Sequence, residues 1–119
     1  MKLKVKRVNA FTESIDGGNP AGVLLDSPNL SDKQMAYISK ELKVSETAFV
    51  FPSDKADYKV RFFSPNIEVD LCGHATIAAF YTMAFEGFLQ GNIIIQETRA
   101  GVLEVYIEFE NKKIKKVMM

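Results

Sequence analysis

Alternating apolar and polar residues predict β-strands along much of the chain. The clearest alternation covers residues 102–110, where the odd-numbered positions are apolar and the even-numbered positions are mostly charged. This period of two is typical of a strand that turns one face toward the core. Alternation or β-branched and aromatic content predicts further strands at residues 2–10, 23–25, 45–51, 58–63, 93–98 and 114–119.

Helical spacing predicts one helix over residues 32–42. Ser31 can accept a hydrogen bond from the first turn of this helix, and Gln34, three residues later, completes a capping box. We therefore expect the helix to cover the core with one face. Its apolar residues recur at intervals of three and four positions, at Met35, Ile38 and Leu42.

A second helix is predicted from His74 to Phe85, after a short strand that starts at Glu68 and a turn at Gly73. Nine of its twelve residues are apolar, and they are not confined to one stripe. A helix that is apolar nearly all round is buried on most sides. We therefore expect this helix to be wrapped on every side.

The composition fits one ordinary globular domain. The 119 residues suffice for one core, and 47% hydrophobic with 25% charged residues is not the composition of a disordered chain. Fifteen basic residues balance fifteen acidic ones, which argues against a nucleic-acid partner. No apolar run approaches the roughly 20 residues of a membrane span, and the alternating N-terminus lacks the apolar region of a signal peptide. We expect a cytoplasmic protein with no membrane partner.

The chain has one cysteine and one histidine, Cys72 and His74, and both lie at the predicted start of the second helix. One cysteine cannot form an internal disulfide, and one cysteine with one histidine is a poor ligand set, so no metal is expected. A helix N-terminus carries free N–H groups and a partial positive charge, which suits a carboxylate. The same position lowers the pKa of a thiol, although a small buried apolar role is the favoured alternative for Cys72.

Four motifs occur in order along the chain and together resemble one known family. They are Phe11 with Gly17-Gly-Asn-Pro-Ala-Gly22, then Ser45-Glu-Thr-Ala-Phe49, then Phe63-Ser-Pro65, then Glu68-Val-Asp-Leu-Cys-Gly-His-Ala-Thr76. In this order and spacing the chain resembles the N-terminal half of PhzF-like (phenazine biosynthesis-like) proteins, which are related in fold to diaminopimelate epimerase. The resemblance covers essentially the whole chain, so residues 1–119 are interpreted as a single N-terminal domain.

The resemblance implies an α+β fold of two similar halves, each a mostly antiparallel, curled, barrel-like sheet around one central helix. In such proteins the active site lies in the cleft between the halves and works without cofactor or metal. The best understood member is an isomerase that moves a proton on a dihydroxanthranilate-type ring. The second half is absent from these 119 residues. We therefore expect either a homodimer or a separate C-terminal half to complete the cleft.

Glu46 is the candidate catalytic residue, because the resemblance matches it to the acid/base glutamate of the family. It starts a predicted strand on the same side as Ala48 and Val50, where apolar neighbours would disfavour the charged form of the carboxyl. A group in such surroundings can take and return a proton near neutral pH. Pattern alone favours a solvated glutamate at a strand end, and the resemblance reverses that preference.

The resemblance assigns substrate contacts to Gly73, His74 and Asn19, and it places Cys72 in the lining of the pocket. His74 has the simpler alternative of a helix cap, and Asn19 that of a turn residue. Asp70 shares a strand side with Cys72 and can orient His74, or it can simply cap the helix. The candidate substrate is a small molecule that carries a carboxylate.

Two functions from different classes remain open. In the first, the chain belongs to an isomerase or epimerase in which Glu46 shuttles a proton while Gly73 and His74 hold the substrate. In the second, the chain is a non-catalytic, truncated half-domain that self-associates and at most binds a small acid. The chain also stops within the apolar run Val117-Met-Met119, which we expect either to be cut or to pair with another chain.

Overall fold

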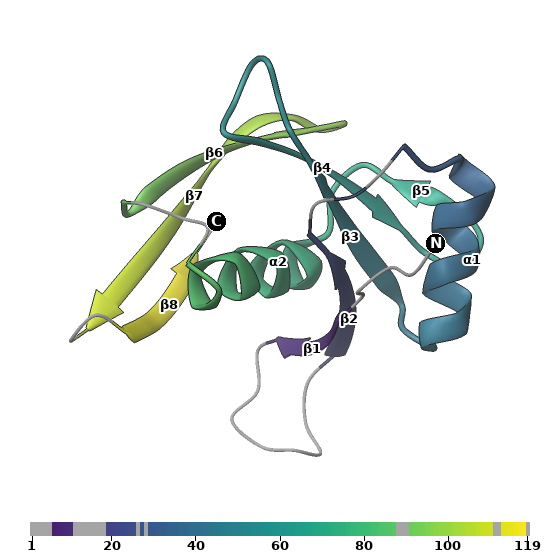
Figure 1. Ribbon diagram of the computed structural model, residues 1–119, viewed down its shortest axis with the longest axis horizontal. Helices are drawn as coiled ribbons and strands as arrows, with labels where there is room; N and C mark the ends of the chain where they lie inside the picture. Colours follow the sequence, from purple (N-terminus) through teal and green to yellow (C-terminus); the bar gives the residue numbers. More distant parts are fainter. Residues whose placement is uncertain are drawn as a thin grey trace.

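The computed structural model of the chain describes residues 6–10, 19–25, 27, 29–87, 91–110 and 113–118 (Figure 1). These residues form strands and two helices, in agreement with the predicted α+β class. In chain order the elements are β1 (Lys6–Ala10), β2 (Asn19–Leu24), α1 (Asp32–Leu42), β3 (Glu46–Phe51), β4 (Tyr58–Phe63), β5 (Glu68–Val69), α2 (Gly73–Phe85), β6 (Ile93–Thr98), β7 (Gly101–Glu110) and β8 (Lys113–Met118).

The strands form one strongly curled sheet around α2 (Figure 1). The order of the sheet is β1-β2-β3-β4-β6-β7-β8, and β5 pairs with β4 beside that path. Among the described pairs, β2–β3 and β4–β6 are parallel and the others are antiparallel. The strands β6 and β7 form a hairpin around Arg99, because Thr98 pairs with Gly101 across it. The expected mostly antiparallel, curled sheet around a central helix is therefore confirmed.

The main core fills the space between α2 and the concave face of the sheet. Val105 and Ile107 of β7 reach this core, which confirms the inward face predicted for residues 102–110. A fully buried side chain of the size of Phe80 contributes about 1.5–3 kcal/mol, so this packing holds α2 firmly in place. The buried hydrophobic side chains that α2 contributes are Ala75, Ala78, Ala79, Phe80 and Met83.

The helix α1 covers the opposite face of the sheet and forms a second, smaller core (Figure 1). Its Met35 packs with Phe49 and Phe63, and all three side chains are at most 1% exposed. The two phenylalanine rings meet edge to face, with centroids 5.9 Å apart. The predicted capping box is confirmed: Gln34 N–H donates to Ser31 Oγ at 3.1 Å, and Ser31 N–H donates to Gln34 Oε1 at 2.8 Å.

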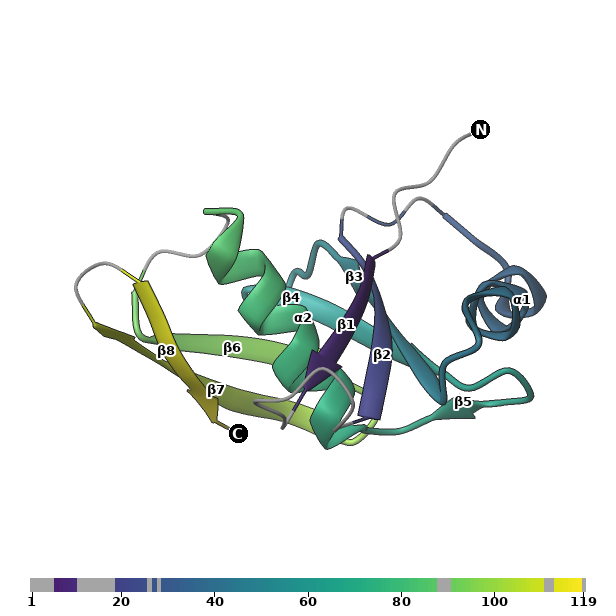
Figure 2. The same ribbon diagram turned by 90° about the horizontal axis from the view of Figure 1, so that it is seen from below.

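One side of α2 stays open, which corrects the expectation that the helix is wrapped on every side. Tyr81 is 43% exposed, Phe85 is 74% exposed, and Ile77 is partly buried. These residues lie one turn apart and form a stripe along the helix. The helix α2 lies between β1 and β8, which end the sheet order, and no described strand joins these two ends (Figure 2). Composition shows that a helix face needs cover, but not which segment supplies it.

The strand β2 begins earlier than the sequence predicts. It starts at Asn19 and includes Pro20, where residue types predict a turn, whereas the predicted strand covers only residues 23–25. Pro20 pairs with Asn9 of β1, and the ladder to β3 begins one residue later. Pro20 therefore has no β3 partner that needs its missing N–H, and the strand tolerates it. Residues 17 and 18 of the predicted turn lie outside the described residues.

The other elements agree closely with the predicted ranges. The bounds of α1, β4 and β6 are as predicted, β3 begins one residue later, and α2 begins one residue earlier. Residues 2–5 of the first predicted strand and residue 119 of the last one lie outside the described residues. Neither described helix has the length and the apolar run that crossing a membrane requires.

Candidate functional site

Glu46, Cys72 and His74 come together at the N-terminus of α2. Glu46 is the first residue of β3, Cys72 is the N-cap of α2, and His74 lies in its first turn. His74 Nε2 lies 3.2 Å from Glu46 Oε2, and His74 Nδ1 lies 3.2 Å from Cys72 Sγ. The hydroxyl of Ser45 lies 3.3 Å from the same Nε2. His74 thus links the carboxylate on β3 to the thiol at the start of the helix.

The local fold explains why these side chains meet. Pairing of β3 with β2 begins at Glu46, and Ala48 and Val50 of β3 face the core around α2. Side chains alternate along a strand, so Glu46 points to the same face as these two residues. The short segment after Val69 leads directly into α2 and carries its first turn to that face. The expected proximity of Glu46 to His74 is confirmed, and the roles of both residues stay predictions.

The carboxylate of Glu46 is only partly satisfied. Its side chain is 22% exposed, but its Oε2 atom is shielded from solvent. This oxygen lies at ion-pair distance from His74 Nε2 but has no hydrogen-bond partner among the described residues, while the thiol of Cys72 can donate to the carboxylate group of Glu46. We interpret the contact as proximity of charge, present when His74 is protonated, and not as a directed hydrogen bond. A shielded acceptor without a donor costs free energy, so Oε2 is suited to receive a proton or a ligand.

The thiol of Cys72 does not have the lowered pKa that its position at a helix N-terminus predicts. The pKa of its thiol is raised, mainly because burial disfavours the thiolate. Hydrogen bonds from the backbone N–H groups of Ala75 and His74 to the sulfur lower this pKa, whereas the charge of Glu46 and a hydrogen bond from the thiol to its carboxylate raise it further. The lowering expected at a helix N-terminus is therefore present but outweighed. A thiol that stays neutral supports the interpretation of Cys72 as pocket lining.

Asp70 lies apart from this cluster, which corrects the roles predicted from its strand side. Its Oδ1 pairs with Arg99 Nε at 3.3 Å, and its side chain is 67% exposed. The N-cap position of α2 is occupied by Cys72, so Asp70 is not the helix cap. Its described partner is Arg99 and not His74. Alternation along one strand cannot show that an arginine from a distant hairpin lies within reach.

Gly73 and Asn19 complete the predicted set of site residues. Gly73 is the first residue of α2, between Cys72 and His74, so its backbone lies at the cluster. Asn19 is the first residue of β2 and pairs with Ala10 of β1. The side chain of Asn19 lies outside what the structure describes. The substrate contacts of both residues stay predictions.

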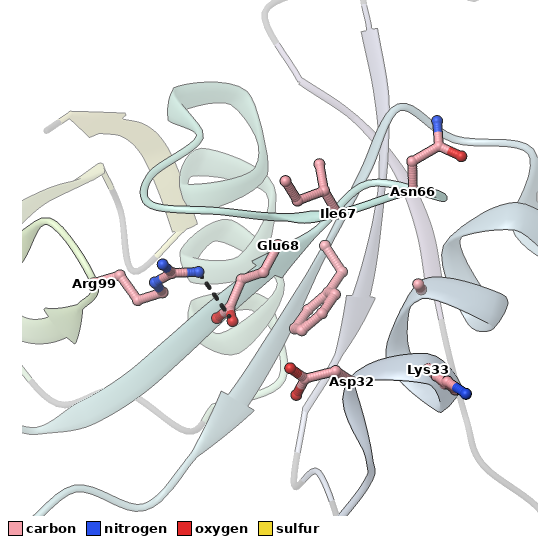
Figure 3. Close-up of a pocket in the computed structure, with 8 residues that line it drawn as sticks. Asp32, Lys33, Asn66, Ile67, Glu68 and Arg99 are labelled. Atoms are coloured by element: carbon pink, nitrogen blue, oxygen red, sulfur yellow. Dashed lines mark ion pairs between the residues drawn. The ribbon is translucent and has the colours of Figure 1, made fainter.

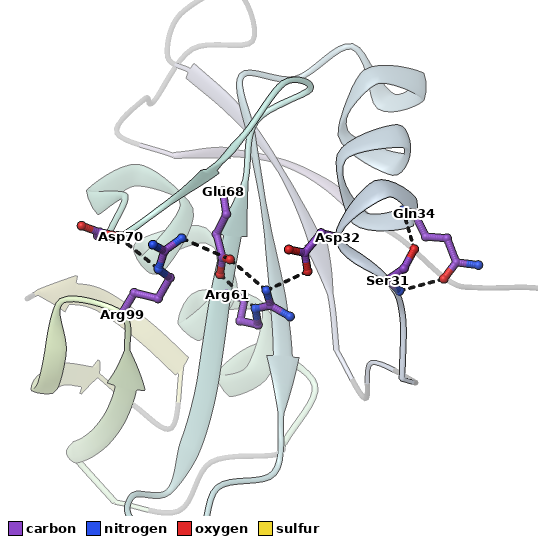
Figure 4. Close-up of polar contacts among 7 residues, drawn as sticks. All are labelled: Ser31, Asp32, Gln34, Arg61, Glu68, Asp70 and Arg99. Atoms are coloured by element: carbon purple, nitrogen blue, oxygen red, sulfur yellow. Dashed lines mark hydrogen bonds and ion pairs between the residues drawn. The ribbon is translucent and has the colours of Figure 1, made fainter.

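A second polar cluster, not found by sequence analysis, joins α1, β4, β5 and the β6–β7 hairpin (Figure 4). We call Asp32, Arg61, Glu68, Asp70 and Arg99 the arginine–carboxylate network. Arg61 donates two hydrogen bonds to Glu68, from Nε at 2.9 Å and from Nη2 at 2.8 Å, and one to Asp32 at 3.0 Å. Arg99 pairs with Glu68 and with Asp70, at 3.3 Å each. Sequence periodicity shows that Arg61 lies on the face of its strand opposite Val60, but it does not identify the partners of Arg61.

The network fixes the charge of its central arginine. Hydrogen bonds to Glu68 and, more weakly, to Asp32 raise the pKa of Arg61 further above its already high ordinary value, although partial burial opposes them. The guanidinium group also lies 5.2 Å from the centre of the Phe63 ring. Arg61 therefore connects the small core under α1 to the strand that leads into α2.

An open recess of about 400 Å³ lies beside the network (Figure 3). Glu46, Cys72 and His74 do not line it, so it is not the cleft that the sequence predicts. Glu68 and Arg99 in its wall already pair with each other (Figure 3). The recess therefore offers a ligand few unpaired charges. Its lining residues are Asp32, Lys33, Ala36, Phe63, Asn66, Ile67, Glu68 and Arg99.

The curled half-barrel around one helix, with a glutamate, a thiol and a histidine at the helix N-terminus, agrees with comparisons to known proteins. The family described as phenazine biosynthesis-like protein (PhzC-PhzF) matches residues 8–119. The chain belongs to this family, as its four motifs predict. It is 43% identical over 119 residues to an uncharacterized isomerase of Clostridium acetobutylicum, covering 98% of this chain and 39% of that relative. The chain thus spans about two fifths of the length of the curated relatives it matches.

Solved structures share the fold. The crystal structure of a phenazine biosynthesis protein of the PhzF family from Bacillus anthracis matches with a TM-score of 0.85 at 37% identity, over 93% of this chain and 38% of that one. A predicted epimerase from Pseudomonas aeruginosa matches with a TM-score of 0.79 at 19% identity, over 92% and 40% of the two chains. At this lower identity the match shows the fold alone. The prediction of an N-terminal half of this fold is confirmed.

Proposed function

We propose that the chain is the N-terminal part of an isomerase or epimerase that moves a proton on a small substrate carrying a carboxylate. Glu46 takes and returns the proton, and Gly73 and His74 hold the substrate. The observation that carries the proposal is the 3.2 Å approach of Glu46 Oε2 to His74 Nε2 at the start of α2. Membership in the family, and a relative that is named an isomerase, support the reaction class.

The proton would move to and from the Oε2 atom of Glu46. This oxygen takes part in no directed hydrogen bond, so it is free to accept a proton from a substrate carbon. His74 Nε2 is within reach of the same carboxyl and can orient it or exchange the proton with it, depending on the tautomer. A thiol with a raised pKa at Cys72 leaves Glu46 as the better base of the pair.

The start of α2 suits the carboxylate of the substrate. N–H groups in the first turn of a helix have no acceptor within the helix, and here no acidic residue lies in the first turn. The thiol of Cys72 is the side chain that the N–H groups of His74 and Ala75 approach, and a bound carboxylate would be a stronger acceptor for them. The positive end of the helix favours an anion by about 0.3–1 kcal/mol at an exposed position. A carboxylate bound there would place its neighbouring carbon beside Glu46. The negative charge that develops when the proton is removed would then lie near the N–H groups.

The proposed site needs a second wall. The chain spans about two fifths of its relatives, and the stripe of Ile77, Tyr81 and Phe85 is not covered by the described residues. We propose that a separate C-terminal half, or a second copy of the chain, covers this stripe and brings further groups opposite Glu46. Burial of these apolar side chains would supply the free energy of association.

Incorporation of deuterium from heavy water tests the proposed function. The chain is incubated alone, and with the C-terminal half of a close relative, with a panel of small carboxylic acids that carry an acidic C–H bond. We expect deuterium to enter one of them beside the carboxylate or within a conjugated ring, under conditions where sedimentation shows that the chain is associated.

The glutamate variants decide the role of Glu46. Glu46→Gln should lower the exchange rate about 10²–10⁴-fold, whereas Glu41→Gln, at an exposed glutamate of α1, should leave it unchanged. Full exchange in Glu46→Gln would show that this residue is not the acid/base group. If the associated, folded protein binds a carboxylic acid but exchanges none of the panel, the alternative of a non-catalytic half-domain that binds a small acid is favoured.

A further inference from the structure

We propose that Glu46, Cys72 and His74 form a binding site for a divalent transition-metal ion, and that Zn²⁺ is the ion that fits it. The ion would inhibit the site and would not serve the reaction as a cofactor. The inhibition rests on the proposed function, because the metal would take the position of the moving proton. The metal binding itself rests only on the arrangement of the three side chains.

The three residues each place one ligand atom at a separation that suits a metal ion. One atom from each lies within 4.8 Å of the other two. Around His74 Nε2, Glu46 Oε2 lies at 3.2 Å and Cys72 Sγ at 3.9 Å. The ligands of tetrahedral zinc lie about 3.3–3.6 Å apart, as follows from bond lengths of roughly 2.0–2.3 Å. Because Nδ1 of the same ring lies closer to Cys72 Sγ, at 3.2 Å, the imidazole must turn so that Nε2 faces both other atoms. That rotation would bring the three atoms into one coordination sphere.

The chemistry of the donor atoms also suits zinc. Thiolate sulfur, imidazole nitrogen and carboxylate oxygen are its usual ligands, and three protein ligands leave the fourth position open. A cation would give a partner to Glu46 Oε2, which is shielded from solvent and has no hydrogen-bond donor. Binding forms the Zn–S bond and releases the thiol proton of Cys72 to the buffer.

The fold supplies the third metal ligand, which the numbers of cysteine and histidine residues alone do not predict. One cysteine and one histidine are a poor ligand set, and it is the packing of α2 against β3 that adds Glu46 to them. The carboxylates of the arginine–carboxylate network do not offer a comparable site. Guanidinium groups lie within 3.3 Å of each of them and would repel a cation.

Titration with Co²⁺ tests the metal site without any substrate. Cobalt replaces zinc in such sites, and a bond to thiolate sulfur gives a charge-transfer band in the near ultraviolet. The full 119-residue chain, free of any histidine tag, is titrated with Co²⁺ and then with Zn²⁺. Because the chain has one cysteine and one histidine, the band can arise only from Cys72. We expect one ion per chain by native mass spectrometry and loss of the band when Zn²⁺ displaces Co²⁺.

Variants of the three ligands separate this site from binding elsewhere. Cys72→Ser should abolish the band. His74→Asn and Glu46→Gln should each weaken cobalt binding by at least the roughly 10–100-fold that loss of a mere outer-shell partner costs a metal site. Glu41→Gln, which alters an exposed glutamate, should bind cobalt as the wild type does. Circular dichroism checks the fold of each variant, and if Cys72→Ser is unfolded, alkylation of Cys72 in the folded wild-type chain removes the ligand instead.

Two results would overturn the proposal. One is the absence of a thiolate band at millimolar cobalt, and the other is an affinity that Glu46→Gln leaves unchanged, since the site would then have only two protein ligands. None of these readings uses turnover, so failure of the metal site and failure of the proposed isomerase are distinguishable. If the metal site and the proposed isomerase activity are both present, excess Zn²⁺ should stop the deuterium exchange and a chelator should restore it.

Discussion

The two polar clusters of this structure use similar residue types in opposite ways. In the arginine–carboxylate network each carboxylate has a guanidinium group within 3.3 Å, and Arg61 holds Glu68 with two hydrogen bonds. At the start of α2, the described partner of Glu46 at ion-pair distance is His74, with a thiol and a hydroxyl nearby. One of the two carboxylate oxygens of Glu46 is shielded from solvent and has no hydrogen-bond donor.

This difference separates a cluster that holds elements together from one that can react. Paired arginine and carboxylate groups cancel each other's charge and fix the geometry of the strands and helices that carry them. A shielded, unbonded oxygen contributes nothing comparable to stability and costs free energy. Such groups gather at functional sites, where a proton, a substrate or a metal ion becomes the missing partner.

Replacing one glutamate of each cluster should produce the largest contrast. Glu46→Gln keeps the shape of the side chain but cannot carry a proton, so the rate of deuterium exchange should fall about 10²–10⁴-fold, the usual worth of general acid–base catalysis. Glu68→Gln should leave the rate per folded molecule nearly unchanged. Exchange rates divided by the concentration of folded protein provide the measurement. Equal losses in the two variants would remove the functional distinction between the clusters.

The stability of the same variants should show the reverse order. Glu68→Gln removes the charge that holds Arg61 and Arg99, so the free energy of unfolding should fall by about 1.5–3 kcal/mol, the range for hydrogen bonds to charged groups. Asp70→Asn is the matched control, because an ion pair at a side chain that is 67% exposed is worth only about 0.2–1 kcal/mol. Urea unfolding measures both. A larger loss for Asp70→Asn than for Glu68→Gln would contradict the account.

Crowding the strand beside Glu46 tests how firmly the fold holds the reactive cluster. A Cβ atom on Gly22 would lie 2.6 Å from Thr47 Oγ1 and 2.7 Å from Leu42 Cδ1. Gly22→Ala should therefore lower the free energy of unfolding by about 1–3 kcal/mol through overpacking. The urea midpoint provides the measurement. An unchanged midpoint would show that β2, β3 and α1 pack less tightly at this point than the distances imply.

The smallest expected effect concerns the electrostatic link between Glu46 and Cys72. The charge of Glu46 raises the pKa of the thiol, so Glu46→Gln should lower this pKa, while burial keeps it above its ordinary value. Iodoacetamide reacts with the thiolate, so the pH profile of alkylation should move to lower pH in the variant. Mass spectrometry follows the reaction, and Glu68→Gln should leave the profile in place. A movement to higher pH would contradict the assigned sign.

Sequence reasoning succeeds here where a feature depends on neighbours along the chain. The capping box of Ser31 and Gln34 and the alternation over residues 102–110 are local, and the structure confirms both. The curled sheet around α2 and the approach of Glu46 to His74 are not local. They are predictable because the four motifs identify the family, whose fold brings distant segments together.

The misses share one physical cause, which is contact between segments far apart in the sequence. Asp70 looks like a helix cap until the β6–β7 hairpin places Arg99 beside it. Cys72 lies at a helix N-terminus, but burial determines that its thiol pKa is raised and not lowered. Phe85 belongs to a helix that is apolar nearly all round, yet its side chain is 74% exposed because no described segment covers it. Periodicity cannot rank these competing effects.

The location of a bound carboxylate tests the central claim most directly. The chain, together with a C-terminal half, is titrated with the carboxylic acid that shows exchange, and backbone amide chemical shifts are followed by NMR. The account predicts that the largest changes occur at Gly73 and His74, and that Glu46→Gln alters them while Glu68→Gln does not. Changes confined to Lys33, Asn66 and Arg99, around the recess beside the arginine–carboxylate network, would contradict it.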